Sequence, residues 1–120
     1  MSLLRRFPWL VPLLIAAGVY FGLQAWRDRQ DAGVGEVVAT LAKPGDIVML
    51  SSVTCVYCKL ASRFFTTHGI AFNECFIETD NACAEAYRQQ GSPGTPTLLV
   101  RGDRQIGFDA TRVAQALGAP

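Results

Sequence analysis

The sequence is poor in net charge and in histidine. Its 11 Lys and Arg residues nearly balance its 10 Asp and Glu residues, which leaves a formal net charge of +1. The chain therefore lacks the basic excess of a nucleic-acid-binding domain, and no nucleic-acid partner is expected. The single histidine, His68, falls at the end of a predicted helix, where a capping or surface role is favoured over that of a catalytic base.

Internal repeats and low-complexity segments are also lacking, and 120 residues suffice for one small domain. Residues 7–26 carry no charge, and Gln24 is their one strongly polar side chain. Twenty helical residues rise about 30 Å, the thickness of a bilayer core. We therefore predict a transmembrane helix at residues 7–26. A cleaved signal peptide is the alternative, because the small residues Ala16, Ala17 and Gly18 resemble a cleavage site.

Charged residues flank the predicted span on both sides. Arg5 and Arg6 precede it, whereas two arginines and two aspartates follow it. The positive-inside rule then places residues 1–6 in the cytoplasm and the rest of the chain outside, which in a bacterial cell is the periplasm. Residues 27–35 are charged and then glycine-rich, so we interpret them as a linker. Residues 36–120 form the predicted folded domain.

The four cysteines comprise a close pair and a wider pair. Cys55 and Cys58 form a Cys-x-x-Cys motif, whereas seven residues separate Cys75 from Cys83. This spacing is not typical of a tetrahedral zinc site, so no metal ligand is expected and the close pair is interpreted as redox-active. A purely structural disulfide in the close pair is disfavoured, because so short a loop gains little from chain entropy. Four cysteines in so small a domain suit an oxidising compartment.

Cys55 falls where a predicted strand gives way to a predicted helix. Residues 47–50 are a short apolar run, and residues 59–65 show the spacing of an amphipathic helix. The free N–H groups and the dipole of a helix N-terminus stabilise a thiolate. Cysteines in such motifs have pKa values lowered from about 8.5 to roughly 3.5–7.5. We predict that Cys55 is the attacking thiol and that Cys58 resolves the mixed disulfide.

The domain reads as alternating helices and strands. We expect a short helix at 36–43 before the first strand. The further elements follow in chain order: a helix at 58–67, a strand at 71–77, a helix that begins after Asp80 or Asn81 as N-cap and ends at 90, a strand at 97–100, a turn at 102–103, a strand at 105–108 and a helix at 110–117. Right-handed crossovers make the first two strands parallel, and the hairpin adds two antiparallel strands. The pattern predicts an α/β fold with a mixed sheet.

A second landmark is Gly94-Thr95-Pro96-Thr97, directly before the third predicted strand. Proline is excluded from central strands but fits the first position of one. Pro96 is therefore either a simple strand start or a cis-proline that presents the Thr95 backbone to an incoming peptide, and the sequence leaves both readings open.

Together these landmarks resemble a glutaredoxin-type member of the thioredoxin superfamily over about residues 36–117. The resemblance rests on Cys-Val-Tyr-Cys at a strand–helix junction, on Thr95-Pro96, and on Gly107-Phe108-Asp109 before the final helix. There is no room for a further strand–helix unit before the motif, which favours glutaredoxin over thioredoxin. The resemblance implies a thioredoxin-like, glutaredoxin-type fold with a mixed four-stranded sheet, flanking helices and a preceding transmembrane helix. It also implies a nucleophilic Cys55, a resolving Cys58, and a cis Thr95–Pro96 turn at the substrate groove.

The resemblance further implies substrate contacts by Tyr57, the family's aromatic residue beside the active site, and by Asp109, which could meet a glutamyl amino group. Ser52 departs from the pattern, because typical glutaredoxins carry a lysine there that meets a glutathione carboxylate. Phe108 departs as well, where the family has glycine. We therefore expect no required cofactor, with glutathione as an optional co-substrate.

Cys75 and Cys83 are extra to the motif. We predict a structural disulfide between the second strand and the second helix, which on the chain-entropy model contributes roughly 2–3 kcal/mol. A second, shuttling redox pair is the alternative.

The expected function is that of a membrane-anchored thiol–disulfide oxidoreductase working through Cys55 and Cys58. Its partners would be protein or small-molecule disulfides and thiols, together with an unidentified redox partner. The alternative, from a different class, is a glutaredoxin-like module that binds glutathione and an iron–sulfur cluster. Two cysteines in the motif and the serine at position 52 argue against that alternative.

Overall fold

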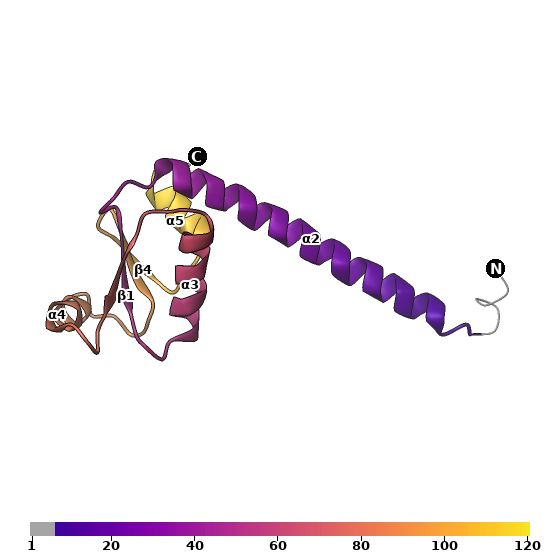
Figure 1. Ribbon diagram of the computed structural model, residues 1–120, viewed down its shortest axis with the longest axis horizontal. Coiled ribbons are helices and arrows are strands. Elements are labelled where there is room, and N and C mark those ends of the chain that lie inside the picture. The colour runs from indigo at the N-terminus through magenta and orange to yellow at the C-terminus, as the bar shows by residue number, and fades with distance from the viewer. Residues whose placement is uncertain (1–6) are drawn as a thin grey trace. The chain divides into compact units, whose positions relative to one another are not determined.

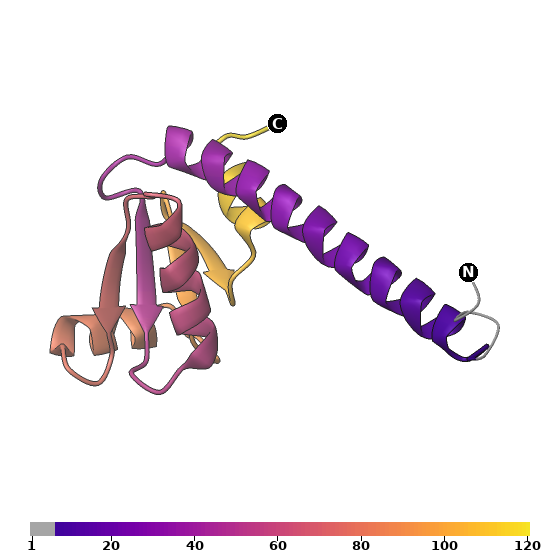
Figure 2. The same cartoon turned by 45° about the vertical axis from the view of Figure 1, so that its right-hand side comes forward.

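The computed structural model describes residues 7–120 (Figure 1, Figure 2). The chain divides into two compact units, one that ends at Ala32 and one that spans Gly33–Pro120. The predicted cytoplasmic segment, residues 1–6 with Arg5 and Arg6, lies outside the described residues.

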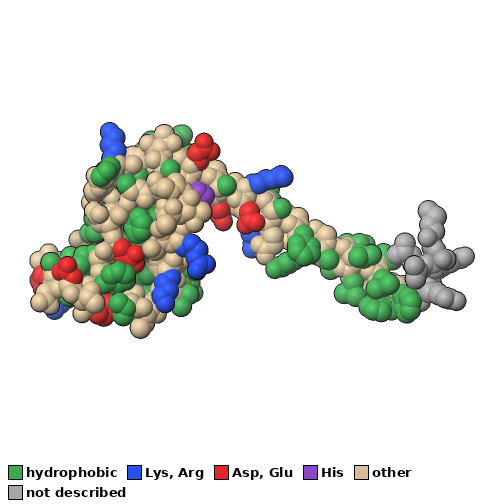
Figure 3. Space-filling model, in the orientation of Figure 1, with side chains coloured by type: hydrophobic (Ala, Val, Ile, Leu, Met, Phe, Trp, Pro, Cys, Tyr) green, Lys and Arg blue, Asp and Glu red, His purple; other side chains and the backbone are tan. Residues whose placement is uncertain are grey.

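The described part of the first unit is dominated by helix α2, Leu10–Leu41, up to Ala32. No side chain of residues 7–32 is buried, and hydrophobic side chains cover the start of the helix (Figure 3). The amide of Gln24 donates a hydrogen bond to the Tyr20 hydroxyl at 3.0 Å, so its polarity is partly satisfied within the helix. By length and composition α2 is a candidate membrane span.

The predicted linker at residues 27–35 is helical and continuous with the residues on both sides of it. Each helical glycine costs about 1 kcal/mol relative to alanine, so Gly33 and Gly35 favour a break. Packing within the second unit overrides this preference. Gly35 is buried, and a Cβ there would lie 2.5 Å from the ring of His68. Gly35 is thus a packing residue, whereas the domain boundaries themselves stay a prediction.

The second unit is built on a four-stranded sheet with the order β2-β1-β3-β4. Strand β1, Ile47–Ser51, pairs in parallel with β2, Asn73–Phe76. On its other side β1 pairs antiparallel with β3, Thr97–Val100, which forms a hairpin with β4, Asp103–Ile106. The predicted mixed four-stranded sheet is confirmed.

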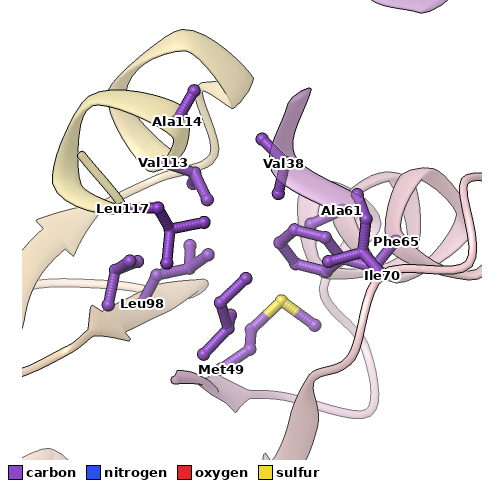
Figure 4. Packing of buried hydrophobic residues seen from close by; sticks show 11 residues of the cluster. Val38, Met49, Ala61, Phe65, Ile70, Leu98, Val113, Ala114 and Leu117 are labelled. Atoms are coloured by element: carbon purple, nitrogen blue, oxygen red, sulfur yellow. The ribbon is translucent and has the colours of Figure 1, made fainter. Parts of the chain in front are cut away.

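Three helices complete the unit: α3, Val56–Thr67; α4, Asn81–Gln89; and α5, Ala110–Ala116. The last turns of α2 lie with α3 and α5 on one face of the sheet, and α4 lies on the other face (Figure 1, Figure 2). Figure 4 shows the resulting core, in which residues of α2, of α3 and α5 and of the segments that follow these two helices meet residues of the two central strands: Val38, Met49, Ala61, Phe65, Ile70, Leu98, Val113, Ala114 and Leu117.

The β3–β4 turn lies one residue earlier than predicted. Arg101 has φ 48° and Gly102 has φ 85°, so both central residues adopt the left-handed conformation of a two-residue hairpin turn. The sequence predicts the turn at Gly102-Asp103, and a left-handed arginine at position 101 is uncommon.

Arg101 is held there by contacts with three other segments. Its guanidinium donates to the carbonyl of Leu117 at 3.2 Å, to the carbonyl of Leu41 at 3.3 Å and to the carboxylate of Asp46 at 3.1 Å. Leu41 is the last residue of α2, and Leu117 is the C-cap of α5. One cation thus binds the free carbonyl groups at two helix ends, where positive charge is favoured.

Replacing Arg101 should destabilise the second unit. We expect Arg101→Ala to lower the free energy of unfolding by about 1–2 kcal/mol, because two helix-end carbonyls lose their donor. Arg101→Lys is the matched control: it keeps the charge but not the planar fork, so its loss should be smaller. Urea unfolding of both variants measures the effect, and wild-type stability in Arg101→Ala would exclude the capping role.

The contribution of Asp46 should depend on pH. The backbone N–H of Lys43, at 2.9 Å, and then the Arg101 guanidinium lower the pKa of Asp46 below its ordinary value of 3.8. A carboxyl whose pKa is lower in the folded state contributes stability that is complete above the unfolded pKa and lost as the pH falls through the folded pKa. The difference in unfolding free energy between wild type and Asp46→Asn should therefore be constant above pH ~5 and shrink below pH ~4. A difference that persists unchanged to pH ~2 would contradict this linkage.

Candidate active site

Cys55 occupies the N-cap of α3, directly after strand β1 and a short loop. Its backbone is extended, with φ −85° and ψ 113°, and its Sγ accepts a hydrogen bond from the Cys58 N–H at 3.1 Å. A sulfur in this position takes the place of the oxygen that usually caps a helix. The free N–H groups of the first turn therefore point toward the group that would carry the thiolate charge.

Cys55 and Cys58 are joined by a disulfide, with a Cα–Cα separation of 5.2 Å. Cys55 is half-buried, whereas Cys58 is only 1% exposed. The structure thus brings the two predicted catalytic sulfurs together and makes them unequal in accessibility. An attacking thiol must be reachable, and a resolving thiol need only reach its neighbour.

Exposed apolar side chains surround this pair. Val53, Val56, Tyr57 and Leu60 are 48%, 65%, 70% and 50% exposed, all within one short stretch of chain around the cysteines. Elsewhere in residues 33–120 the large apolar side chains with comparable exposure are Val37 and Ile106. Single exposed apolar side chains are common on protein surfaces, whereas a cluster of them is typical of a contact site.

The loop before Cys55 is held by Glu78, a residue that the sequence analysis did not single out. The Ser52 hydroxyl donates to one carboxylate oxygen of Glu78, and the Val53 N–H donates to the other at 3.3 Å. The Ser52 carbonyl in turn accepts from the Cys55 N–H at 3.2 Å. The Ser52 hydrogen bond, above all, holds the pKa of Glu78 below its ordinary value of 4.5. The sequence around Glu78 shows no motif or spacing from which its contact with the Ser52–Val53 loop could be predicted.

The Thr95–Pro96 peptide bond is cis, and Pro96 is buried. Thr97 pairs with Leu50 near the end of β1, so the start of β3 lies at the same end of the sheet as the cysteine loop. The Pro96 carbonyl accepts the Gly107 N–H at 2.8 Å, and the Thr97 hydroxyl donates to the Gly94 carbonyl at 2.8 Å. The topology thus brings this turn and the cysteine motif to one edge of the sheet.

Asp109 is the N-cap of α5. One of its carboxylate oxygens accepts the N–H groups of Thr111 and Arg112 at 3.0 and 3.2 Å. The preceding residue, Phe108, packs against Phe64 and Phe65 of α3, with ring centroids 5.2 and 5.4 Å apart. The capping role is therefore visible, whereas substrate contacts by Asp109, Tyr57, Thr95 and Pro96 stay predictions.

Cys75 and Cys83 are joined in a second disulfide, with a Cα–Cα separation of 5.5 Å. It links β2 to the first turn of α4, where Cys83 is 4% exposed. This is the pairing that the sequence predicts, and a purely structural role for it remains a prediction.

A groove of about 550 Å³ runs along α3 on the side of β2 and reaches the buried Cys58. Lys59 and Arg63 contribute positive charge to it, and Glu74 contributes negative charge. The remaining lining is mainly hydroxyl and apolar side chains: Ser52, Val53, Ser62, Thr66, Thr67 and Phe76.

Comparison with known proteins places this arrangement in a family. The glutaredoxin family model matches residues 47–105, which include both motif cysteines and Thr95-Pro96. Among curated proteins, none matches the chain.

Solved structures share the fold. A single-residue variant of the thioredoxin-like protein BC3987 has a TM-score of 0.56 at 22% identity, covering 63% of this chain and 99% of that one. The glutaredoxin from Methanosarcina mazei Go1 has a TM-score of 0.52 at 22% identity, covering 62% and 79%. The methanoredoxin of Methanosarcina acetivorans has a TM-score of 0.53 at 26% identity, covering 64% and 88%. The chain is a glutaredoxin-like member of the thioredoxin superfamily, a group of thiol–disulfide redox proteins.

Proposed function

We propose that the protein is a membrane-anchored thiol–disulfide oxidoreductase that exchanges disulfides through Cys55-Val56-Tyr57-Cys58. The observation that carries the proposal is the unequal pair at the start of α3. Cys55 is accessible and receives a backbone N–H, whereas Cys58 is buried within bonding distance of it.

In the reductive direction, the Cys55 thiolate attacks one sulfur of a substrate disulfide. A Cys55–substrate disulfide forms, and the other substrate sulfur leaves as a thiolate that takes up a proton. The Cys58 thiolate then attacks Cys55 Sγ, which releases the second substrate thiolate and leaves the Cys55–Cys58 disulfide. Two electrons pass to the substrate. Oxidation of a dithiol is the same sequence in reverse.

The position of Cys55 favours the first step. The N–H groups at the start of α3 stabilise the thiolate of reduced Cys55, which is the form that attacks a disulfide. The two sulfurs carry both electrons, so the proposed reaction uses no resident cofactor. Glutathione is the proposed optional co-substrate, and the reduction potential of the pair decides the direction of exchange.

We further propose that α2 anchors the protein as a single membrane span, with the N-terminus in the cytoplasm and the redox domain in the periplasm. Its first half is apolar on all sides, and Trp9 and Trp26 lie near the ends of that half, where interfacial aromatics are enriched. The Cys75–Cys83 disulfide supports an oxidising compartment.

The cysteine roles predict opposite behaviour of two serine variants. Cys55→Ser should abolish exchange, because the accessible nucleophile is lost. Cys58→Ser should still attack but should accumulate a mixed disulfide, because the resolving sulfur is missing. Dithiol-exchange rates and non-reducing gels measure both effects. Full activity in Cys55→Ser, or equal trapping by both variants, would overturn the assignment.

The anchor predicts fractionation with membranes. The full chain should stay in the membrane pellet after carbonate extraction, and a reporter fused at the C-terminus should be active in the periplasm. Replacing Leu14 and Phe21 together by Arg should release the protein or block its export, since each charge at the centre of a span costs about 2.5–3.5 kcal/mol. Quantitative recovery of the wild-type chain in the soluble fraction would refute the anchor.

A further inference from the structure

Glu78 lies in a loop that is held in place by a disulfide and by a backbone hydrogen bond. It belongs to the short segment between β2 and α4, and the Cys75–Cys83 disulfide closes the chain around that segment. The Ile77 N–H donates to the Ser51 carbonyl at 3.0 Å, which joins this segment to the end of β1. The carboxylate is therefore held at a defined place by its surroundings as well as by its own hydrogen bonds.

That place is the rim of the redox site. The Cys55 N–H bonds to the Ser52 carbonyl, so Ser52 and Cys55 are the two ends of one tight turn. The ends of such a turn lie within about 7 Å of each other. Since Ser52 also donates its hydroxyl to Glu78, the carboxylate is on the order of 10 Å from Cys55, about one Debye length at physiological salt.

The carboxylate is exposed and has no cationic partner. Both of its donors, the Ser52 hydroxyl and the Val53 N–H, are neutral. Within residues 7–120 the ion pairs are Arg88–Glu85 and Arg101–Asp46, and neither includes Glu78. An ionised carboxylate offers about four lone-pair directions, so acceptor capacity remains.

Other charged groups belong to the groove that the loop borders. Lys59, Arg63 and Glu74 line the groove along α3 with Ser52 and Val53. None of them forms an ion pair with Glu78. A substrate that reaches Cys55 past the Ser52–Val53 loop thus meets a fixed, unpaired negative charge.

We propose that Glu78 is a specificity-determining residue, whose carboxylate binds a cationic group beside the substrate disulfide. This inference rests on the proposed function and names its substrate class: a protein or peptide disulfide with a lysine, arginine or free amine close to it. The exposed apolar side chains around Cys55 offer contact to the rest of such a peptide. Anionic thiols and disulfides should react more slowly at this rim, and glutathione, the proposed optional co-substrate, belongs to that slower class.

A purely structural role for Glu78 makes a different prediction. Glutamine could still accept the Ser52 and Val53 donors through its carbonyl oxygen, so Glu78→Gln keeps much of the loop contact and removes the charge. If only the loop contact matters, substrates of opposite charge should be affected equally. If the charge matters, the ratio of the kcat/KM values for the two kinds of substrate should change.

The test uses the full chain in detergent and two cystine peptides that differ only in flanking residues, Lys in one and Glu in the other. Wild type should have the higher kcat/KM for the Lys peptide, and Glu78→Gln should lower the Lys/Glu ratio by about 2- to 5-fold, the range for an exposed ion pair. Glu36→Gln is the matched control. It removes one negative charge from α2. That helix precedes the start of β1, whereas the cysteine loop follows the end of β1, so the Lys/Glu ratio should stay at the wild-type value.

A second measurement needs no variant: raising the salt to about 0.5 M should lower the wild-type ratio toward one, because screening weakens exposed charge pairs. A wild-type ratio at or below one, or an unchanged ratio in Glu78→Gln, would overturn the inference while the proposed exchange reaction stands. Failure of the proposed function would appear separately, as undiminished exchange activity in Cys55→Ser.

Discussion

The site depends on where strand β1 ends. β1 is paired on both sides, and its last three residues, Met49, Leu50 and Ser51, are buried, so the end of the strand is fixed by backbone pairing and by packing. From that point the chain has only a short loop before α3 begins. The parallel neighbour β2 delivers Glu78 to the same end of the sheet, and the antiparallel neighbour β3 delivers Pro96. The disulfide, the carboxylate and the proline lie at one end of the sheet because the three strands are paired in this register.

The opposite end of the sheet has its own organising contact. Arg101 joins the end of α2, the start of β1 and the end of α5 through one guanidinium. The two ends of the sheet are therefore stabilised by different kinds of interaction. Hydrogen bonds from a cation close the end that faces α2, whereas covalent sulfur bonds and a carboxylate organise the end that carries the chemistry.

Much of this arrangement could be predicted from local sequence. The strand–helix junction at Cys55, the N-cap role of Asp109, the parallel first pair of strands and the pairing of Cys75 with Cys83 all follow from spacing and capping preferences. These features depend on residues close together in the chain, or on a topology with few alternatives.

The features that could not be predicted depend on contacts between distant residues. Gly35 is typical of a linker until the ring of His68 is placed beside it. In the sequence, Arg101 is an ordinary residue at the end of a strand. Its left-handed backbone is explained by the carbonyl groups that its side chain binds in the folded unit. Glu78 lies far along the chain from Ser52, and no periodicity connects the two. Each contact needs the folded sheet before it exists.

The sheet order has a consequence for solubility. β2 and β4 are the two edge strands, and an open edge can recruit the backbone of another molecule into a longer sheet. Both edges are four residues long, and each carries charged side chains, Glu74 on one and Asp103 and Arg104 on the other. Short, charged edges resist such recruitment. The proposed anchor would hold the domain at high local concentration on a membrane surface, where copies would meet often, and its short, charged edges would oppose backbone pairing between them.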